Sequence, residues 1–391
     1  MRVLLLLLAG ALLLFFRHVT GMLPTEQAAL RWAYGEARYG QVTAFFPVHN
    51  GLSQMQAQGI FSGIQGSLAQ EGFQIEQGGQ GGDFVYAYSA QGVLEVASRD
   101  RGATFAYATF VGGNFFHFQP VQLISGSHLP QDDVNRDMVL IDENLAWRLF
   151  GSVHLIADIG DLPEGEVQDF VPEVFIEGMP YVVVGVFRPP GDFASRAAYG
   201  DGMHIILYYD APGLLEPPPI TSLQAVLPNP VGGFAEGIFA EAIEGGEITE
   251  DCFVLVNNAE RYRLRDLFRV MGDFGSRSMY RTGLSLPYWE NAARLTEDYA
   301  ALALLLMLLL FLLLFIQGLV SGIRRFRRRK WRLFATLSRK VGDRAEERKE
   351  RAHYGARYAD THGDDEDDAR YDVEDIIRFV RESEGQDETE D

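Results

Sequence analysis

The sequence predicts an α+β protein in which a bipartite extracytoplasmic domain lies between two transmembrane helices. Two long apolar segments, one near the N-terminus and one at 300–323, bracket a region without such segments. Within that region, short runs of strand-forming residues are separated by Gly, Pro, Asn or Asp. Strand–helix units precede and follow these runs, which is the pattern expected of an α+β domain split by a β-rich insert.

The first apolar segment spans 3–16 and fits either a signal-peptide core or a short membrane helix. Because no good small-residue cleavage site follows it, we favour an uncleaved transmembrane helix or signal anchor over 1–23. The side chain of Arg17 would then extend toward the lipid headgroups. A stalk is expected at 24–40, with a helix from Thr25 to Tyr39.

The first half of a membrane-proximal lobe is expected at 41–93. It begins with a strand at 41–48, and a helix follows because the next apolar residues recur at helical spacing. These residues are Leu52, Met55, Ile60, Ile64 and Leu68. The Gly-rich break at 78–83 fits a hairpin, since a phosphate loop would require a following GKS or GKT.

A β-rich insert lobe is expected at 94–214. Its strand-like runs are FAYATFVGGNFFHF, VQLISG, DMVLID, EVFIEG, YVVVGVFR and HIILYY. The run ENLAWRLFG predicts a helix, which Asp142 can cap and Gly151 can end. The buried face of this helix comprises Leu145, Leu149 and Phe150. The run FIEGMPYVVVGVF predicts a hairpin that turns at Gly178–Pro180.

The second half of the membrane-proximal lobe is expected at 215–286. Strands at SLQAVL and CFVLVNN alternate there with helices at VGGFAEGIFAEAIEG and AERYRLRDLFRVMGD. A second stalk at 287–299 contains no Pro or Gly after Pro287. We therefore expect one helix that continues from this stalk into the membrane.

The second apolar segment, 300–323, contains no charged residue. At about 1.5 Å per residue it reaches about 36 Å, enough to cross a hydrocarbon core of about 30 Å. The basic juxtamembrane collar at 324–351 belongs in the cytoplasm by the positive-inside rule, and it can hold anionic membrane lipid. Both termini are therefore expected to be cytoplasmic in a cell-membrane protein, with 24–297 extracytoplasmic.

The acidic cytoplasmic tail at 352–391 is expected to be mostly disordered, because its charge is dense and its hydrophobicity low. One stretch, 371–382, carries an apolar stripe at helical spacing. It fits either transient helicity or a short helix that docks on a cytoplasmic partner.

Composition excludes several classes of function. The chain of 391 residues has a net charge of −20, and its acidic central region argues against a nucleic-acid partner. The single cysteine, Cys252, excludes an intrachain disulfide and a Cys-rich metal site. The acid pairs Asp132–Asp133 and Asp142–Glu143 lack the spacing of a calcium loop and are better explained by turns and helix caps. We name no catalytic, cofactor-binding or metal-ligating residue, and expect neither an enzyme nor a cofactor.

A set of motifs between about 105 and 210 resembles the MacB-type periplasmic core domain of FtsX-like ABC transporter permeases. The sequence reads NFFHFQPVQLISGSHLPQDDVNRDMVLIDENLAWRLFGS and then EGMPYVVVGVFRPPGDF. The matching motifs are an aromatic-rich strand, a small-residue turn, an acidic turn, a hydrophobic strand, an A..LFG helix and a hairpin ending in VVGV. They fall at Asn114–Phe118, Ser125–Leu129, Gln131–Asp133, Met138–Ile141, Ala146–Gly151 and Val182–Val186.

The resemblance implies a structural role for these motifs and a domain that transmits movement across the membrane. It implies a separate cytoplasmic ABC ATPase as driver, since the chain contains no GxxxxGK[ST] signature. Complete permeases of this family have four membrane helices, and two are predicted here. A second permease subunit or a homodimer is therefore an expected partner.

Two functions follow as hypotheses. The first is a non-catalytic membrane subunit of a MacB/FtsX-type assembly. The alternative is a membrane-anchored extracellular sensor or binding protein acting on a ligand or a cell-wall enzyme. Its contact surface would comprise Phe115, Phe116, Phe118 and a flexible loop at Arg188–Gly202, although core packing is the favoured interpretation of the three Phe residues.

Overall fold

A computed structural model describes residues 2–33, 38–73, 84–130, 135–156, 171–214, 216–246, 248, 252–258, 260–274, 277 and 286–359. The fold is α+β, as predicted. Residues up to Leu312 form one compact unit, and the chain from Leu313 onward forms a second. The sheet and the features that follow belong to the first unit, except that α9 continues past Leu312. The predicted segments 78–83, 131–133 and 371–382 lie outside the described residues.

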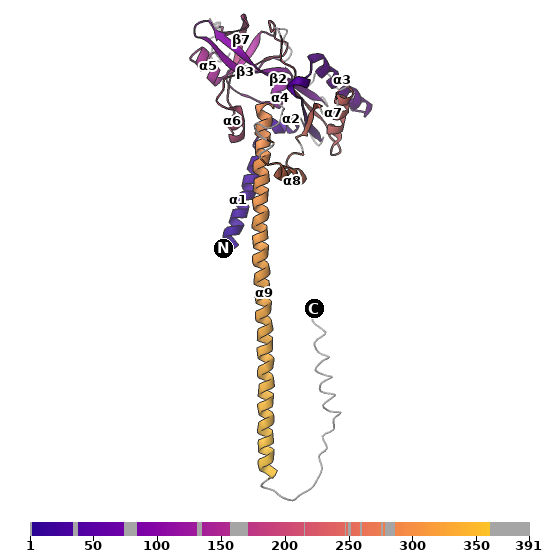
Figure 1. Cartoon of the computed structure of the whole chain (residues 1–391), viewed down its shortest axis with the longest axis vertical. Helices are drawn as coiled ribbons and strands as arrows, with labels where there is room; N and C mark the ends of the chain where they lie inside the picture. The colour runs from indigo at the N-terminus through magenta and orange to yellow at the C-terminus, as the bar shows by residue number, and fades with distance from the viewer. Residues whose placement is uncertain are drawn as a thin grey trace, which may run out of the picture. The chain divides into compact units, whose positions relative to one another are not determined.

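A ten-stranded sheet forms the centre of the first unit (Figure 1). Its strands are β1 (Tyr39–Phe45), β2 (Val85–Ser98), β3 (Gly102–Gly113), β4 (Gln122–Gly126), β5 (Met138–Asp142), β6 (Glu173–Ile176), β7 (Met179–Arg188), β8 (His204–Tyr208), β9 (Ser222–Pro228) and β10 (Val254–Asn257). They follow the order β10-β1-β9-β2-β3-β8-β5-β7-β4, and β6 pairs with β2 and β7. Most pairs are antiparallel, whereas β3–β8 and β5–β7 are parallel.

The long β2–β3 hairpin connects the strands assigned to the two predicted lobes. The first part of β2 pairs with β9, from Val85 to Ser89, and its far end pairs with β6. The predicted lobe boundary at 94 therefore falls inside a strand. One sheet runs through both regions, and β2 pairs with strands on either side of that boundary.

Helix α3 (Gln54–Gln70) forms where the apolar spacing predicts it. Ser53 and Gln56 make a capping box at its start, which satisfies two backbone N–H groups that would otherwise lack partners. Ile60, Ile64 and Leu68 are buried, and α3 packs against α7 (Phe234–Glu244). Met55, which belongs to the same spacing, is 83% exposed and lies outside the buried face.

Helix α5 (Glu143–Leu149) also confirms its prediction. The Asp142 Oδ1 atom accepts a hydrogen bond from the backbone N–H of Leu145 at 2.8 Å, so Asp142 is the N-cap. Leu145 and Leu149 of the predicted buried face are buried, whereas Phe150 is half-buried. Gly151 follows the helix with φ +74°, a conformation that favours glycine and ends the helix.

The predicted hairpin at FIEGMPYVVVGVF forms from β6 and β7. Its turn lies at Glu177 and Gly178, both of which have positive φ, and Ile176 pairs with Met179. The turn therefore begins one residue earlier than predicted, and Pro180 belongs to β7.

The aromatic stretch Asn114–Phe118 is a short helix, α4 (Phe115–Phe118), and its assignment as a strand is wrong. β3 ends at Gly113, where φ is +66° and a Cβ would lie 2.6 Å from the Tyr86 carbonyl oxygen. The chain turns there, and the helix buries Phe115 and Phe118 while Phe116 is half-buried. Core packing is thus confirmed for Phe115 and Phe118.

The segment predicted as a flexible loop, Arg188–Gly202, contains helix α6 (Phe193–Tyr199), so that prediction is wrong. Asp192 caps the helix, because its Oδ1 atom accepts a hydrogen bond from the Ser195 N–H at 2.7 Å. Ala194 and Tyr199 are buried. A capped helix with buried contacts is a fixed part of the domain.

The two predicted stalks differ. After α1 (Arg2–Thr20) the chain forms a short 3₁₀ helix, η1 (Pro24–Gln27), and then α2 (Ala28–Trp32), so no continuous helix extends from Thr25. Gln27 leaves the helical conformation between η1 and α2, and Ala33 is extended, which ends α2 at Trp32. Helix α9 (Tyr288–Ala359), by contrast, begins directly after Pro287 and continues without a break, as predicted. Both α1 and α9 are long and apolar enough to cross a membrane.

Candidate functional site

The first turns of α9 are enclosed by the outer domain. Trp289, Ala292 and Ala293 are buried, although they lie only a few turns before the apolar segment of the same helix. We call this region, where η1, α6, α8 (Leu264–Gly272) and the start of α9 meet, the stalk junction. The residues in it come from chain segments far apart in the sequence.

A cluster of buried charges holds one side of the stalk junction. Arg261, 3% exposed at its side chain, lies between β10 and α8 and contacts three carboxylates. Its Nε lies 3.0 Å from Glu26 Oε2, its Nη1 lies 2.7 Å from Glu297 Oε1, and its Nη2 donates to Glu290. The Arg261–Glu26 contact is an ion pair without hydrogen-bond geometry.

Two further arginines complete this ionic cluster. Arg294 Nε lies 2.8 Å from Glu290 Oε1, and Arg277 Nη2 lies 2.5 Å from Glu297 Oε2. Three arginines thus face three glutamates. A buried network with balanced charge is tolerated, but removal of one partner leaves an uncompensated charge in a low-dielectric environment.

Burial shifts the protonation equilibria of the ionic cluster. It raises the pKa of Glu26 to about 7, although the positive charge of Arg261 opposes this shift. Burial alone would lower the pKa of Arg261, but Glu26, Glu290 and Glu297 more than offset it and hold that pKa well above its usual value. Arg261 is therefore a permanent cation, whereas Glu26 changes charge close to neutral pH.

Helix α6 holds the other side of the stalk junction. Ala194 of α6 shares a buried apolar cluster with Leu23, Ala292 and Ala293, and these small side chains allow the backbones to approach closely. Tyr199, at the end of α6, stacks on the His204 ring with centroids 3.7 Å apart and meets the Tyr288 ring edge-on at 5.0 Å. These rings join α6 and β8 to the first turn of α9.

Asp142 has a second role that its sequence position did not reveal. Besides capping α5, it accepts a hydrogen bond from the Tyr199 hydroxyl through Oδ2 at 3.2 Å. Burial raises the pKa of Asp142 to about 6, against the opposing effect of its hydrogen bonds, and burial lowers that of His204 to about 4. At neutral pH the carboxylate is therefore charged and the His204 ring neutral.

The stalk junction joins separate segments of the chain through ion pairs, hydrogen bonds and packed rings. Its carboxylates are engaged by arginines or by hydrogen bonds. No group of three or more His, Cys, Asp or Glu side chains within the described part of the chain could hold a metal ion. Cys252 is half-buried and lies before β10.

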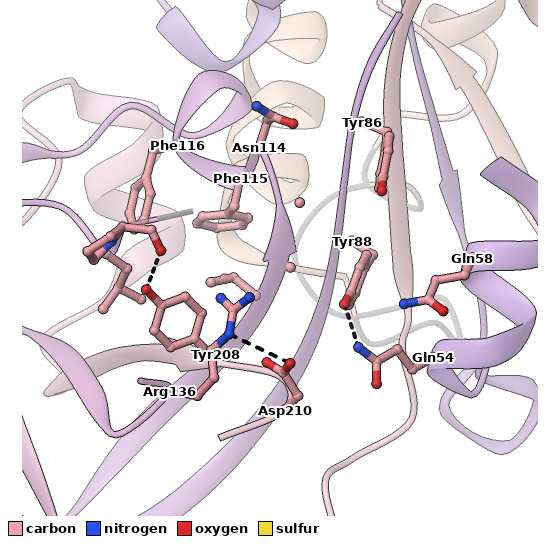
Figure 2. A pocket seen from close by; sticks show the side chains of 15 residues that line it. Gln54, Gln58, Tyr86, Tyr88, Asn114, Phe115, Phe116, Arg136, Tyr208 and Asp210 are labelled. Atoms are coloured by element: carbon pink, nitrogen blue, oxygen red, sulfur yellow. Dashed lines mark hydrogen bonds and ion pairs between the residues drawn. The ribbon is translucent and has the colours of Figure 1, made fainter. Parts of the chain in front are cut away.

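A pocket of about 310 Å³ lies elsewhere on the same unit (Figure 2). Figure 2 shows Gln54, Gln58, Tyr86 and Tyr88 on one side of it and Phe115, Arg136 and Tyr208 on the other. Gln54 Nε2 donates to the Tyr88 hydroxyl at 3.0 Å. Amide groups and aromatic rings thus line one concave surface.

The far side of this pocket carries a paired charge. The Arg136 guanidinium lies over the Tyr208 ring, 4.4 Å from its centroid, and 3.7 Å from the Asp210 carboxylate. Because one cation is paired with one anion, the lining is close to electrically neutral. Gly112 forms part of the lining, and a Cβ there would clash with the Tyr88 ring.

Sequence reasoning missed both features, although part of the ionic cluster left a signal. Glu290, Arg294 and Glu297 recur at i, i+4 and i+7, which places them on one face of a helix directly before an apolar span. Arg261 and Glu26 gave no such signal, since only the fold brings them to that face. The pocket likewise draws its lining from several separate elements.

No family model and no curated protein sequence matches this chain. Among solved structures, the periplasmic region of MacB from Actinobacillus actinomycetemcomitans matches with a TM-score of 0.36 and 15% identity, covering 56% of this chain and 89% of that chain. The extracellular domain of the noncanonic ABC-type transporter YknZ from Gram-positive bacteria matches with a TM-score of 0.35 and 11% identity, covering 56% of this chain and 100% of that chain.

A third solved structure is a domain described as part of a permease protein from Porphyromonas gingivalis. It matches with a TM-score of 0.31 and 13% identity, covering 56% of this chain and 89% of that chain. Similarity at this level carries no information about substrates or partners. The MacB-like resemblance drawn from the sequence names the same class of domain as these solved structures do.

Proposed function

We propose that the chain is a non-catalytic membrane subunit that passes movement of its outer domain through α9 to a cytoplasmic ATPase. One observation carries the proposal. Helix α9 begins among buried contacts of the outer domain and continues as one helix through an apolar span to Ala359. A continuous helix transmits displacement along its axis, because each turn is hydrogen-bonded to the next.

The stalk junction supports this role by its composition. Arg261 ties the start of α9 to η1 after the first membrane helix, and Ala194 of α6 packs beside Ala292 and Ala293. A displacement of the sheet would therefore reach both membrane helices. Such coupling requires an element with discrete packing arrangements, since packed interiors are bistable and resist continuous deformation.

The proposed topology places both termini in the cytoplasm. The basic collar after the second span supports this orientation by the positive-inside rule, and residues 24–297 then face outward. An ATPase would bind on the cytoplasmic side, to residues within 324–391. A second permease subunit or a second copy of this chain would complete the assembly.

Affinity purification from native membranes in mild detergent tests the proposal. The full-length chain should co-purify with an ABC-type ATPase identified by mass spectrometry, and ATP hydrolysis should be measurable in the eluate. A chain truncated after 351 serves as the matched control and should lose the ATPase if the tail contributes to binding. Repeated purification of the full-length chain without any ATPase would refute the proposal.

A second function, a membrane-anchored binding protein, is favoured by one observation, the pocket in Figure 2. Pockets of roughly 300 Å³ lie at the lower end of small-molecule sites. Aromatic rings, amide groups and a paired charge suit a small neutral ligand with hydroxyl or amide groups and an apolar face, such as a saccharide.

Binding of N,N′-diacetylchitobiose to the full-length protein in nanodiscs, measured by calorimetry, tests this second function. Wild-type protein should bind the probe, and Gly112→Ala should bind it more weakly, because the added methyl group displaces the Tyr88 ring. The exposed Gly59, around which a Cβ would meet nothing within 4 Å, offers a control substitution, Gly59→Ala. Equal binding by both variants, or no binding by the wild type, would remove the pocket as the site.

A further inference from the structure

Helix α8 lies where the outer domain meets the membrane helices (Figure 1). Its buried residues Leu267 and Val270 share one apolar cluster with Val19, in the last turn of α1, and with α9. The α9 members of this cluster are Ala300, Ala301, Leu304 and Met307. Helix α8 is therefore packed against the outer ends of both apolar spans, beside the start of the hydrocarbon region.

The depth of this contact can be worked out from the helix rise. From Ala300 to Met307 the axis of α9 advances about 10 Å at about 1.5 Å per residue. Helices that lie in the interface of a bilayer bury their apolar face to roughly 5–10 Å. The level at which α8 packs on α9 thus matches the level of an interfacial helix.

The apolar surface of α8 is wider than the strip that the protein covers. Leu264 and Phe268, one turn apart, are 60% and 53% exposed, and Phe274 beyond the helix end is also exposed. At 100° per residue, Leu264 and Phe268 lie directly beside the strip formed by buried Leu267 and Val270 and partly buried Met271. One flank of the apolar face is therefore packed on protein and the next flank is open.

The polar side of α8 carries two exposed arginines. Arg265 and Arg269 lie one turn apart, next to the open apolar flank, and both are exposed. Arg269 makes a long contact of 3.9 Å with Asp266, and Arg263 before the helix pairs with Glu260 at 2.7 Å. Within the described residues, no ion pair involves Arg265. An apolar flank bordered by arginines is typical of helices at a phospholipid surface.

We propose that α8 lies in the outer interface of the membrane, with Leu264 and Phe268 in the upper acyl region and Arg265 and Arg269 at the level of the lipid phosphates. Exposed apolar side chains of α9 lie at the same level, since Leu302 and Leu305 are exposed next to the shared cluster. The occupant of the open flank is thus phospholipid. The outer domain would rest on the membrane surface at a second point besides its two spans.

Site-directed fluorescence in the full-length protein tests this placement. Cys252 is replaced by alanine, and Phe268→Cys is labelled with a polarity-sensitive bimane probe. The protein is placed in nanodiscs that contain phosphatidylcholine and phosphatidylglycerol, with or without lipid brominated in the upper acyl chain. Leu264→Cys provides a second site, so the result does not depend on a single substitution.

Two labelled positions calibrate the measurement. Phe105 lies on β3 and is 68% exposed, so a probe at Phe105→Cys reports an exposed aromatic position on the sheet. Leu306→Cys lies on the exposed side of the α9 span and reports lipid contact. A labelled variant is used only if its unfolding temperature equals that of the Cys252→Ala background, which confirms that the labelled protein is folded.

The probes at 264 and 268 should have blue-shifted emission. Brominated lipid should quench most of that emission, as it does for the probe at 306. The probe at 105 should lose little. Replacement of Arg265 and Arg269 by Gln together should reduce quenching at 268 when phosphatidylglycerol is present, because the attraction to anionic headgroups is removed. Quenching at 264 and 268 no greater than at 105 would overturn the proposal. A blue shift without quenching would also overturn it, because protein rather than lipid would then cover the flank.

Discussion

Replacement of Arg261 by methionine should destabilise the outer domain more than any substitution of an exposed arginine. Methionine keeps the apolar stem of the side chain but removes the cation between three carboxylates. Glu290 retains Arg294, and Glu297 retains Arg277. Glu26 has no other cation within reach among the described ion pairs, so it becomes the uncompensated charge.

The size of the stability loss in Arg261→Met follows from the burial of the ion pairs that it breaks. Breaking a buried ion pair by removing one partner costs about 3–5 kcal/mol, because the remaining charge stays in a low-dielectric environment. Glu26 can relieve part of this cost by taking up a proton, since burial already raises its pKa to about 7. The loss should therefore be smaller at pH 6 than at pH 8. At about 2–4 °C per kcal/mol, the unfolding temperature should fall by roughly 10 °C at pH 8.

Thermal unfolding of the full-length protein in detergent measures this change. The matched control is Arg263→Gln, since Arg263 is exposed and its pair with Glu260 is worth about 1 kcal/mol or less. The double variant Arg261→Met with Glu26→Gln should recover part of the loss, because no unpaired carboxylate then remains at that position. An Arg261→Met protein as stable as Arg263→Gln would refute the account of the ionic cluster.

Three further predictions concern the stalk junction. The pKa of Glu26 is about 7 in the folded protein and 4.5 in the unfolded chain, so its contribution to stability is full below pH 4.5 and is lost as pH rises to 7. In denaturation experiments across this pH range, the free energy of unfolding of Glu26→Gln should therefore rise relative to that of wild type, by up to about 3 kcal/mol. Parallel curves for the two proteins would contradict this. Tyr199→Phe removes a hydrogen bond to the buried Asp142 carboxylate and should lower the free energy of unfolding by about 1.5–3 kcal/mol in the same assay; an unchanged value would mean that the bond contributes nothing. Ala194→Leu should overpack the contact with α9 and lower the free energy of unfolding by about 1–3 kcal/mol. The control Ala197→Leu, on the exposed side of α6, should leave it unchanged. Equal effects of the two substitutions would argue against tight packing at Ala194.

Other buried groups also change charge in this pH range, so the effect of Glu26 is measured as a difference between two proteins. His204, whose pKa burial lowers to about 4, contributes stability that increases with pH from 4 to 6.5, opposite in sign to Glu26. Asp142, whose pKa burial raises to about 6, changes in the same direction as Glu26. Comparison of Glu26→Gln with wild type cancels both contributions, because neither residue contacts Glu26.

Sequence patterning predicted the elements whose formation depends on their own residues. Helix α5 is an example, since Asp142 as a cap, Leu145 and Leu149 as a buried face and Gly151 as a stop all lie within ten positions. The hairpin of β6 and β7 and the unbroken start of α9 after Pro287 are further examples. In each case the deciding interactions are local, so the order of residues is enough to predict them.

Other predictions failed because the deciding contacts are distant in the sequence. The segment Arg188–Gly202 reads as a loop from its glycines and prolines, yet α6 forms there because Ala194 and Tyr199 are buried against α9 and β8. Asn114–Phe118 reads as a strand from its aromatic content, but the chain turns at Gly113, which lies close against the Tyr86 backbone of β2. In both cases tertiary contacts outweigh local propensity.

The sequence by itself therefore determined two apolar spans, an α+β domain between them and a helix that joins this domain to the membrane, because periodicity and hydropathy act over short distances. Only the tertiary structure placed Arg261 among three glutamates from η1 and α9, and only it set α8 against both spans with Leu264 and Phe268 exposed. Electrostatic and packing energies depend on separation in space, and the fold alone sets that separation for residues that lie far apart in the chain.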